Sequence, residues 1–183
     1  MIADAKTPNQ AVHRSGRSGR IQIASHSRPP GDLGSLANHR RCPMNETELV
    51  NNANALTEIF GYWPSFHDAE VLTMCLDRAG DDGPSLVTQV HVYEMTDRVD
   101  DRGYYVLRKH TLVTLRFADI LLRNLRWFNN QNSLSGLGIY AAEEEAVDGR
   151  AIGVSFGSNF GVEADLLCRG ATVIKVEPYK PTG

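Results

Sequence analysis

Residues 60–70 read Phe-Gly-Tyr-Trp-Pro-Ser-Phe-His-Asp-Ala-Glu, and this stretch marks the junction from which the fold class can be argued. The spacing of apolar residues is helical before it and strand-like after it. Aromatic side chains bury large areas, so Tyr62, Trp63 and Phe66 are predicted to fasten a helix end to a sheet. The alternative is a partly exposed binding patch.

One helix is predicted N-terminal to this junction. Apolar residues recur every three or four positions across 49–60, which places one apolar stripe on a helix of about four turns. Thr47, or Asn45 before it, has a side chain suited to the N-cap. Gly61 is the natural stop, and Pro64 prevents continuation.

After residue 68 the apolar period becomes two, which indicates strands. The predicted strands are 71–76, 86–95, 104–117, 120–127, 137–142, 152–156, 162–168 and 172–178, with turns at 80–84, 147–150, 157–159 and 169–170. A helix is the alternative for 120–127. Short strands in series imply an antiparallel pattern, so the fold class is α+β: a mainly antiparallel sheet of about six to eight strands with one N-terminal helix packed on it.

The first 43 residues differ in composition from the rest of the 183-residue chain. They are rich in Ser, Arg, Gly, Pro and His without any period, which predicts a disordered basic extension. Its SGRSGR repeat is either a nucleic-acid contact or a solvated tail. Because Met44 opens a domain-like sequence, we hypothesise that 1–43 is translated from a misplaced start codon. The single domain is predicted to span 44–183.

The charge of the chain is divided unevenly. Residues 1–43 hold seven basic and two acidic side chains, and the remaining 12 basic and 20 acidic ones give 44–183 a net charge of −8. Such a domain is repelled by nucleic acid and attracted to basic partners. The sequence has neither an apolar run long enough for a membrane span nor a secretory leader, so cytoplasm is the expected location. The three widely spaced cysteines indicate no disulfide framework, and no cofactor is expected.

His67, Asp68 and Glu70 carry the atoms needed for acid–base catalysis or for half of a metal site. His91 or His110, on neighbouring predicted strands, would supply the further ligands. A metal-assisted hydrolase is therefore the enzymatic alternative. It requires these groups to converge in one cleft.

A structural role explains the segment His67-Asp68-Ala69-Glu70 without catalysis or metal binding. Adjacent residues of an extended segment point to opposite faces, which separates His67 from Asp68. In this interpretation Asp68 accepts hydrogen bonds from backbone N–H groups of the turn, and His67 packs against Trp63 or Phe66.

An acidic loop is predicted between the strands that end near residue 95 and begin at residue 104. Glu94 and Asp97 stand at its start, and Asp100 and Asp101 follow. A run of like charges is usually only solvated. The alternative is that it mimics phosphate groups toward a basic partner.

Four stretches resemble the immunity protein 50 family of bacterial polymorphic toxin systems. They are FGYWPSFHDAEV at 60–71, HVYEMTD at 91–97, RGYYVLRKHTLVTLRF at 102–117 and FNNQNSLSGLGI at 128–139. The resemblance covers roughly 49–178. It implies a small, single-domain, non-enzymatic protein that binds and neutralises a cognate toxin. It carries over no catalytic residue and no cofactor.

A nuclease toxin would be basic, and the acidic domain suits such a partner. On this resemblance the acidic loop is predicted to form an exposed electrostatic rim with aromatic residues nearby. The predicted partner-binding residues are Tyr62, Trp63, His67, Asp68, Glu70, Glu94, Asp97, Asp100, Asp101 and Tyr104. A structural or regulatory module with another partner is the third hypothesis.

Overall fold

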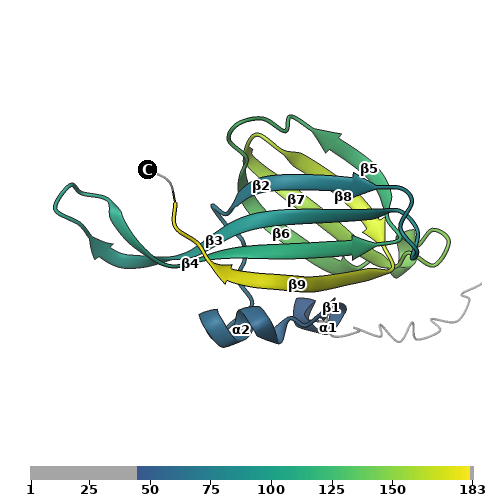
Figure 1. Cartoon of the computed structure of the whole chain (residues 1–183), viewed down its shortest axis with the longest axis horizontal. Helices are drawn as coiled ribbons and strands as arrows, with labels where there is room; N and C mark the ends of the chain where they lie inside the picture. The colour runs from purple at the N-terminus through teal and green to yellow at the C-terminus, as the bar shows by residue number, and fades with distance from the viewer. Residues whose placement is uncertain (1–44, 182–183) are drawn as a thin grey trace, which may run out of the picture. The chain divides into compact units, whose positions relative to one another are not determined.

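The computed structural model describes residues 45–181 (Figure 1). The predictions for residues 1–43 lie outside this range. The elements are α1 (Glu46–Leu49), β1 (Val50–Asn51), α2 (Asn54–Phe60), β2 (Glu70–Asp77), β3 (Ser85–Val99), β4 (Tyr105–Ala118), β5 (Leu121–Arg126), β6 (Ser133–Ala141), the 3-10 turn η1 (Glu143–Glu145), β7 (Ile152–Phe160), β8 (Glu163–Cys168) and β9 (Gly170–Pro178). None of the helices in this range is long and apolar enough to cross a membrane.

The nine strands of the described range form one sheet in the order β1-β9-β4-β3-β2-β6-β7-β8-β5. Only the β1–β9 pair is parallel, and all other neighbours are antiparallel. The predicted α+β class with a mainly antiparallel sheet is therefore confirmed. The predicted strand number was too low, because β1 arises within the segment that was assigned to the helix.

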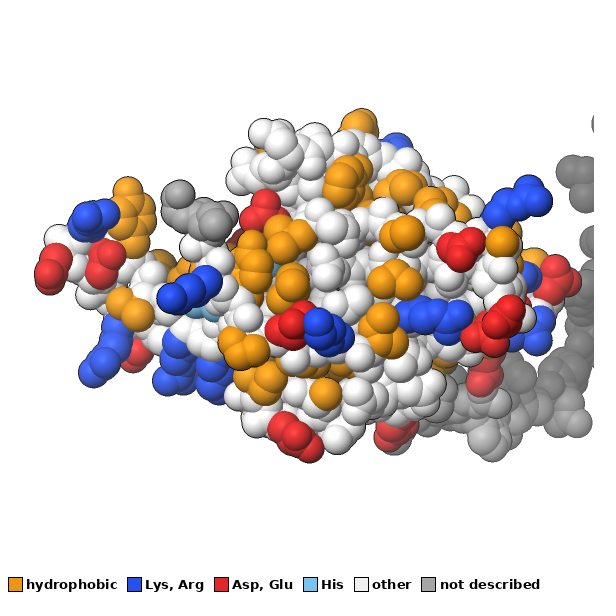
Figure 2. All heavy atoms as spheres, in the orientation of Figure 1, with side chains coloured by type: hydrophobic (Ala, Val, Ile, Leu, Met, Phe, Trp, Pro, Cys, Tyr) orange, Lys and Arg blue, Asp and Glu red, His pale blue; other side chains and the backbone are white. Residues whose placement is uncertain are grey.

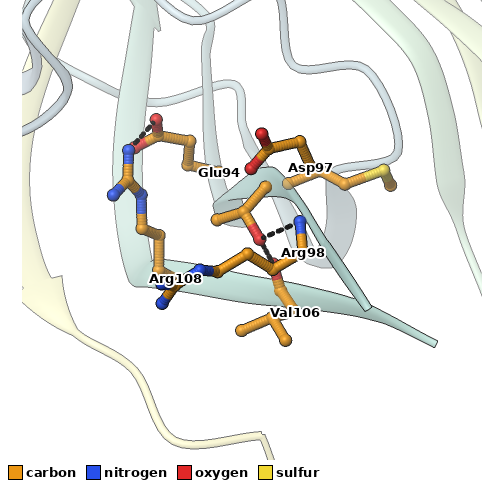
Figure 3. Close-up of a pocket in the computed structure, with 7 residues that line it drawn as sticks. Glu94, Asp97, Arg98, Val106 and Arg108 are labelled. Atoms are coloured by element: carbon orange, nitrogen blue, oxygen red, sulfur yellow. Dashed lines mark hydrogen bonds and ion pairs between the residues drawn. The ribbon is translucent and has the colours of Figure 1, made fainter. Parts of the chain in front are cut away.

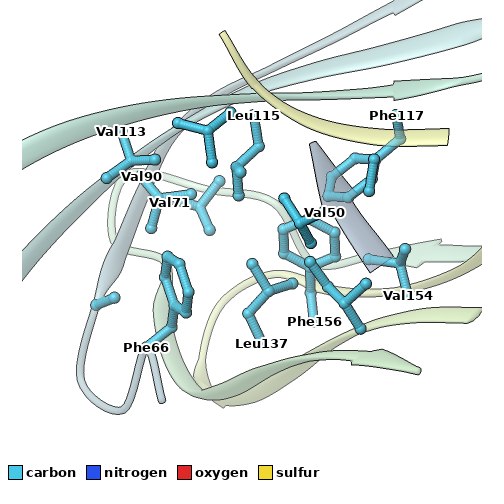
Figure 4. Packing of buried hydrophobic residues seen from close by; sticks show 14 of the residues in the cluster. Val50, Phe66, Val71, Val90, Val113, Leu115, Phe117, Leu137, Val154 and Phe156 are labelled. Carbon is cyan, nitrogen blue, oxygen red and sulfur yellow. The ribbon is translucent and has the colours of Figure 1, made fainter. Parts of the chain in front are cut away.

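The sheet bends into two layers that enclose the core. β2 pairs with β6 at a single position, Glu70 with Ser133, and the layers diverge from there. Figure 1 shows β2, β3, β4 and β9 in front of β5 to β8. Between the layers the rings of Phe117 and Phe156 meet edge to face, with centroids 6.0 Å apart (Figure 4). Burial of these apolar side chains holds the two layers together.

The predicted four-turn helix is wrong in its length. Val50 and Asn51 pair with Ala171 and Thr172 of β9, which divides the segment into α1 and α2. Asn52 follows with a φ of 60°, and its Nδ2 donates a hydrogen bond to the Val173 carbonyl oxygen at 2.9 Å. Asparagine tolerates this left-handed conformation. Backbone pairing with β9 thus outweighs the local helical pattern.

The helix stop at Gly61 is confirmed. Gly61 has a φ of 87°, and its N–H donates to the Thr57 carbonyl oxygen at 2.8 Å. Asn45 precedes α1, yet its side chain makes no capping hydrogen bond. Leu56 and Phe60 are the buried residues of the short helix α2.

Two boundaries and one alternative in the sheet were predicted wrongly. Residues 121–126 pair with β8 as a strand, so the helical alternative for 120–127 is wrong. β7 continues to Phe160 without the turn predicted at 157–159, and the chain reverses at Gly161, whose φ is 82°. The acidic loop is shorter than predicted, because Val99 still pairs with Tyr105.

As a result β3 and β4 extend well beyond the two layers as a two-stranded ribbon (Figure 1). We call residues 94–109 the arm and the rest of the described range the body. A register shift between Met95 and Val99 leaves Asp97 and Arg98 without ladder partners. The arm is the feature around which the predicted site residues have to be placed.

Candidate partner-binding surface

The ten predicted partner-binding residues fall into two groups. One group lies in the segment 62–70, between α2 and the start of β2. The other lies on the arm. Two contacts connect the groups: Lys109 Nζ donates to the Phe60 carbonyl oxygen at 3.3 Å, and the Tyr93 hydroxyl donates to the Asp68 carbonyl oxygen at 3.0 Å. The segment 62–70 and Glu94 therefore lie at the base of the arm, whereas Asp97, Asp100, Asp101 and Tyr104 lie farther along it.

The negative charge of Glu94 is balanced by neighbouring cations at the base of the arm. Its Oε1 accepts a hydrogen bond from Arg108 Nη2 at 2.7 Å, and its Oε2 lies 2.9 Å from Lys109 Nζ. The hydrogen bonds from Arg108 and Lys109 lower the pKa of Glu94 to about 2. Glu94 is thus ionised at neutral pH, but its charge is matched by two cations of the same chain.

A hollow of about 420 Å³ lies on one face of the arm (Figure 3). It is lined by Glu94, Met95, Thr96, Asp97, Arg98, Val106 and Arg108. The Thr96 hydroxyl donates to the Val106 carbonyl oxygen at 2.7 Å and accepts from the Arg98 N–H at 3.3 Å. The lining holds the carboxylates of Glu94 and Asp97 beside the guanidinium groups of Arg98 and Arg108. This charged lining suits polar contacts.

The tip of the arm is shaped by Asp100. Its Oδ1 accepts hydrogen bonds from the backbone N–H groups of Arg102 and Tyr104, each at 2.9 Å. Asp97 and Asp101 are exposed, and so is Tyr104. The carboxylates of the predicted rim therefore lie together on the exposed arm with an aromatic ring beside them, and one of them also builds the turn.

Basic residues balance the acidic residues of the arm, which the sequence-based prediction did not count. The acidic ones are Glu94, Asp97, Asp100 and Asp101, and the basic ones are Arg98, Arg102, Arg108 and Lys109. Four of each give the arm a formal net charge of zero. The charge of −8 on residues 44–183 therefore belongs to the body.

The aromatic residues of the junction have different environments. Phe66 is buried, and Trp63 packs against it with ring centroids 5.7 Å apart. Tyr62 is exposed, and its ring meets the Phe60 ring edge to face, with ring centroids 6.4 Å apart. The prediction that aromatic residues fasten the junction to the sheet is right for Trp63 and Phe66 and wrong for Tyr62.

His67 and Asp68 interact with each other at the surface. Their Nδ1 and Oδ2 atoms are 2.9 Å apart, and the His67 side chain is 63% exposed. His67 therefore does not pack against Trp63 or Phe66, contrary to prediction. Asp68, with a φ of 60°, uses Oδ1 to accept a hydrogen bond from Asn159 Nδ2 at 3.0 Å. The left-handed backbone at Asp68 directs the side chains of His67 and Asp68 to the surface, where they contact each other.

His91 and His110 form a separate pair on the outer face of the front layer. His91 Nε2 lies 3.0 Å from His110 Nδ1, and the Tyr179 ring covers His91 with centroids 4.4 Å apart. Burial lowers the pKa of His91 to about 4, and the neighbouring His110 adds to the effect. Glu70 stands beside His91 in the β2–β3 ladder.

The convergence that a metal-assisted hydrolase requires is not met in the described part of the chain. His67 pairs with Asp68, whereas His91 pairs with His110. Within residues 45–181 no group of three or more His, Cys, Asp or Glu residues is arranged to hold a metal ion. The tetrad at 67–70 is therefore better explained by its local contacts.

The sequence-based prediction missed the exposed apolar residues of the arm. They are Met95, Val99, Tyr105 and Val106. Three of them stand in predicted strands, and Val99 was placed in a loop. The feature that could have identified these residues is the unusual length of the hairpin. That length is known only from the pairing of β3 with β4.

The family model described as Immunity protein 50 matches residues 52–179. The matched range contains the whole arm and the segment 62–70. No curated protein and no solved structure matches the chain.

Proposed function

Since the chain belongs to the Immunity protein 50 family, we propose that it is a non-enzymatic protein that binds a cognate toxin protein and thereby neutralises it. The family membership is the observation that carries this proposal. The partner would be the toxin of the same polymorphic toxin system, encountered in the cytoplasm. Neither nucleic acid nor a membrane is proposed as a partner of the folded domain.

The arm and the segment 62–70 form the proposed contact surface. The arm projects from the body, so a partner reaches it without displacing any element (Figure 1). Its aromatic residues Tyr104 and Tyr105 are exposed, and tyrosine is enriched among residues that dominate binding energy. The contacts of Lys109 and Tyr93 anchor the root of the arm to the segment 62–70. Anchoring at the root lowers the ordering cost of binding.

A basic toxin, such as a nuclease, remains the preferred partner class. The charge of −8 on residues 44–183 attracts a basic protein over a distance and raises the association rate. The body carries this charge, and it acts whichever surface makes the final contact. The chemistry of the toxin is set by the toxin itself.

Co-expression tests the proposal. The toxin encoded by the neighbouring gene is produced in a host with and without this protein, and host growth is measured. We expect growth to be rescued. Binding is measured by calorimetry between the purified protein and a catalytically inactive variant of the toxin, with an unrelated toxin as the control. Absence of both rescue and binding would refute the proposal.

A further inference from the structure

The two faces of the arm differ in chemistry. Successive residues of a strand face opposite sides, and residues paired across an antiparallel ladder share a side. Met95 pairs with Leu107 and Val99 with Tyr105, and the two β4 residues are two positions apart. These four side chains therefore share one face, which we call the outer arm face. The Glu94–Arg108 pair lies on the opposite face, and Met95, at the edge of the outer arm face, also lines the hollow.

The outer arm face is apolar and largely uncovered. Met95 is 50% exposed, Val99 56% and Tyr105 59%, and the neighbouring Tyr104 is 70% exposed. Figure 2 shows apolar side chains on the projecting arm among acidic and basic ones. A two-stranded ribbon gains little stability by itself, and normally needs its apolar face covered. The described body does not provide that cover, which leaves the outer arm face open to a partner.

The charges around the outer arm face point to the chemistry of that partner. Asp97 is followed by Arg98, and Asp101 is followed by Arg102, so opposite charges border the apolar residues. Glu94 is held by Arg108 and Lys109. An arm with zero net charge creates no field of one sign. The matching surface therefore has an apolar centre and a border with both signs of charge.

The shape of the arm favours a concave occupant. A cleft that takes in the outer arm face and the tip buries more of the ribbon than a flat partner would. In a second copy of this chain the hollow on the arm has a charged lining, which does not match an apolar face. The occupant proposed is therefore a different protein.

We propose that the toxin holds this chain by taking the outer arm face into a cleft with an apolar floor, and that long-range attraction to an acidic rim contributes little to affinity. The proposal rests on the proposed function and specifies its contact. It replaces the picture of Asp97, Asp100 and Asp101 as the main determinants of binding. These carboxylates then serve to border the patch and, for Asp100, to shape the turn.

Neighbouring residues of β4 provide a matched test, since Tyr105 lies on the outer arm face and Val106 lines the hollow on the other. Binding of the inactive toxin is measured for Tyr105→Ser, Val99→Ser, the double variant of these two residues, and Val106→Ser. We expect each outer-face variant to lose affinity by at least about 10-fold, and the double variant by more than about 100-fold. Val106→Ser is expected to stay within about 3-fold. Circular dichroism and the thermal midpoint confirm that each variant is folded.

Neutralising the arm carboxylates separates the apolar contact from an electrostatic rim, because salt would screen the charge of the body as well. At about 50 mM NaCl we expect the association rate constant of Asp97→Asn/Asp101→Asn to stay within about 3-fold of that of the unaltered protein, whereas loss of a steering rim would reduce it by more than about 10-fold. The double variant Asp97→Asn/Asp101→Asn is expected to bind within about 3-fold of the unaltered protein. A larger loss in either measurement overturns the proposal in favour of the acidic rim.

The remaining outcomes distinguish failure of the proposed function from failure of this inference. If the unaltered protein does not bind the toxin, the proposed function and this inference both fail. If it binds and Tyr105→Ser binds equally well, only the inference fails. If Tyr105→Ser changes the molar mass in solution by light scattering without changing toxin binding, the outer arm face joins two copies of this chain and the inference is wrong.

Discussion

Asp119 Oδ1 and Arg150 Nη2 lie 2.5 Å apart and join the residue after β4 to the turn that precedes β7. Arg150 Nε also donates to the Asp119 carbonyl oxygen at 2.9 Å, and Asp119 Oδ2 lies 2.6 Å from Arg169 Nε. Arg169 stands between β8 and β9, where the chain passes from one layer to the other. Asp119 therefore ties three connections at the corner where β4 ends, while the arm leaves from the start of β4.

Removal of the Asp119 carboxylate is expected to be costly. The side chains of Asp119 and Arg150 are largely buried, so Asp119→Ala leaves a cation with reduced solvation. We expect the free energy of unfolding to fall by roughly 2 to 4 kcal/mol in urea titrations followed by circular dichroism. The exposed Asp148, 3.6 Å from the same arginine, is the control, and Asp148→Ala should cost less than about 0.5 kcal/mol. Equal effects of the two variants would contradict this role.

Asn132 is expected to be the most sensitive residue of the amide-rich run at 129–132. It is buried, and its Oδ1 accepts from the N–H groups of Asn129 at 3.0 Å and Val162 at 3.1 Å. Its Nδ2 donates to the Asn129 carbonyl oxygen at 2.7 Å. Because Asn132→Ala leaves these buried groups unpaired, we expect a loss of about 2 to 3 kcal/mol in the free energy of unfolding. The exposed Asn130→Ala should change it by less than about 0.5 kcal/mol.

Two glycines with the same backbone conformation differ in the space around them. Gly161 has a φ of 82° and Gly103 a φ of 87°. A Cβ at Gly161 would collide with the Gln131 carbonyl oxygen and with Asn132, whereas a Cβ at Gly103 would meet nothing within 4 Å. Gly161→Ala is therefore expected to cost more than about 3 kcal/mol of unfolding free energy, and Gly103→Ala about 1 to 2 kcal/mol. Thermal unfolding of both variants measures the difference.

The stability of the fold is expected to depend on the protonation of His91. Its side chain is buried, and its pKa is lowered from 6.5 to about 4 on folding. Above pH 6.5 the imidazole is neutral in both states and contributes no pH dependence. Between pH 6.5 and about 4 the unfolded chain takes up a proton that the folded protein does not bind. The free energy of unfolding therefore falls on acidification through this window, by up to about 3 kcal/mol.

The variant His91→Gln tests this pH dependence. Glutamine keeps a hydrogen-bonding group near His110 but does not titrate. We expect the slope of unfolding free energy against pH to become shallower across this window, measured by urea titration at several pH values. An unchanged slope in the variant would show that other groups are responsible.

Much of the sheet was predictable because its strands alternate apolar and polar residues over a buried face. The segments that became β2, β3, β4, β6, β7, β8 and β9 were all located, and the helix stop at Gly61 followed from local backbone chemistry. Local preference did not predict β1 or the buried role of Asn132. Both depend on partners far along the chain, at β9 and at the turn before β8.

The candidate surface was predictable only in part. The exposed positions of Asp97, Asp101 and Tyr104 followed from the polar character of the segment. The equal numbers of acidic and basic residues in 94–109 can be counted in the sequence. They matter for partner binding because β3 and β4 continue past the body, and only the structure reveals this. The pairing of Glu94 with Arg108 likewise required the register of the two strands.

By itself the sequence determined the α+β class, the positions of most strands along the chain and the membership in a family of immunity proteins, since these follow from periodicity and from local motifs. Only the tertiary structure decided which residues are presented to a partner. That choice depends on strand register and on where the body ends, and both are set by contacts between residues distant in the chain. The apolar outer face of the arm exists because β3 and β4 keep pairing where the core no longer covers them.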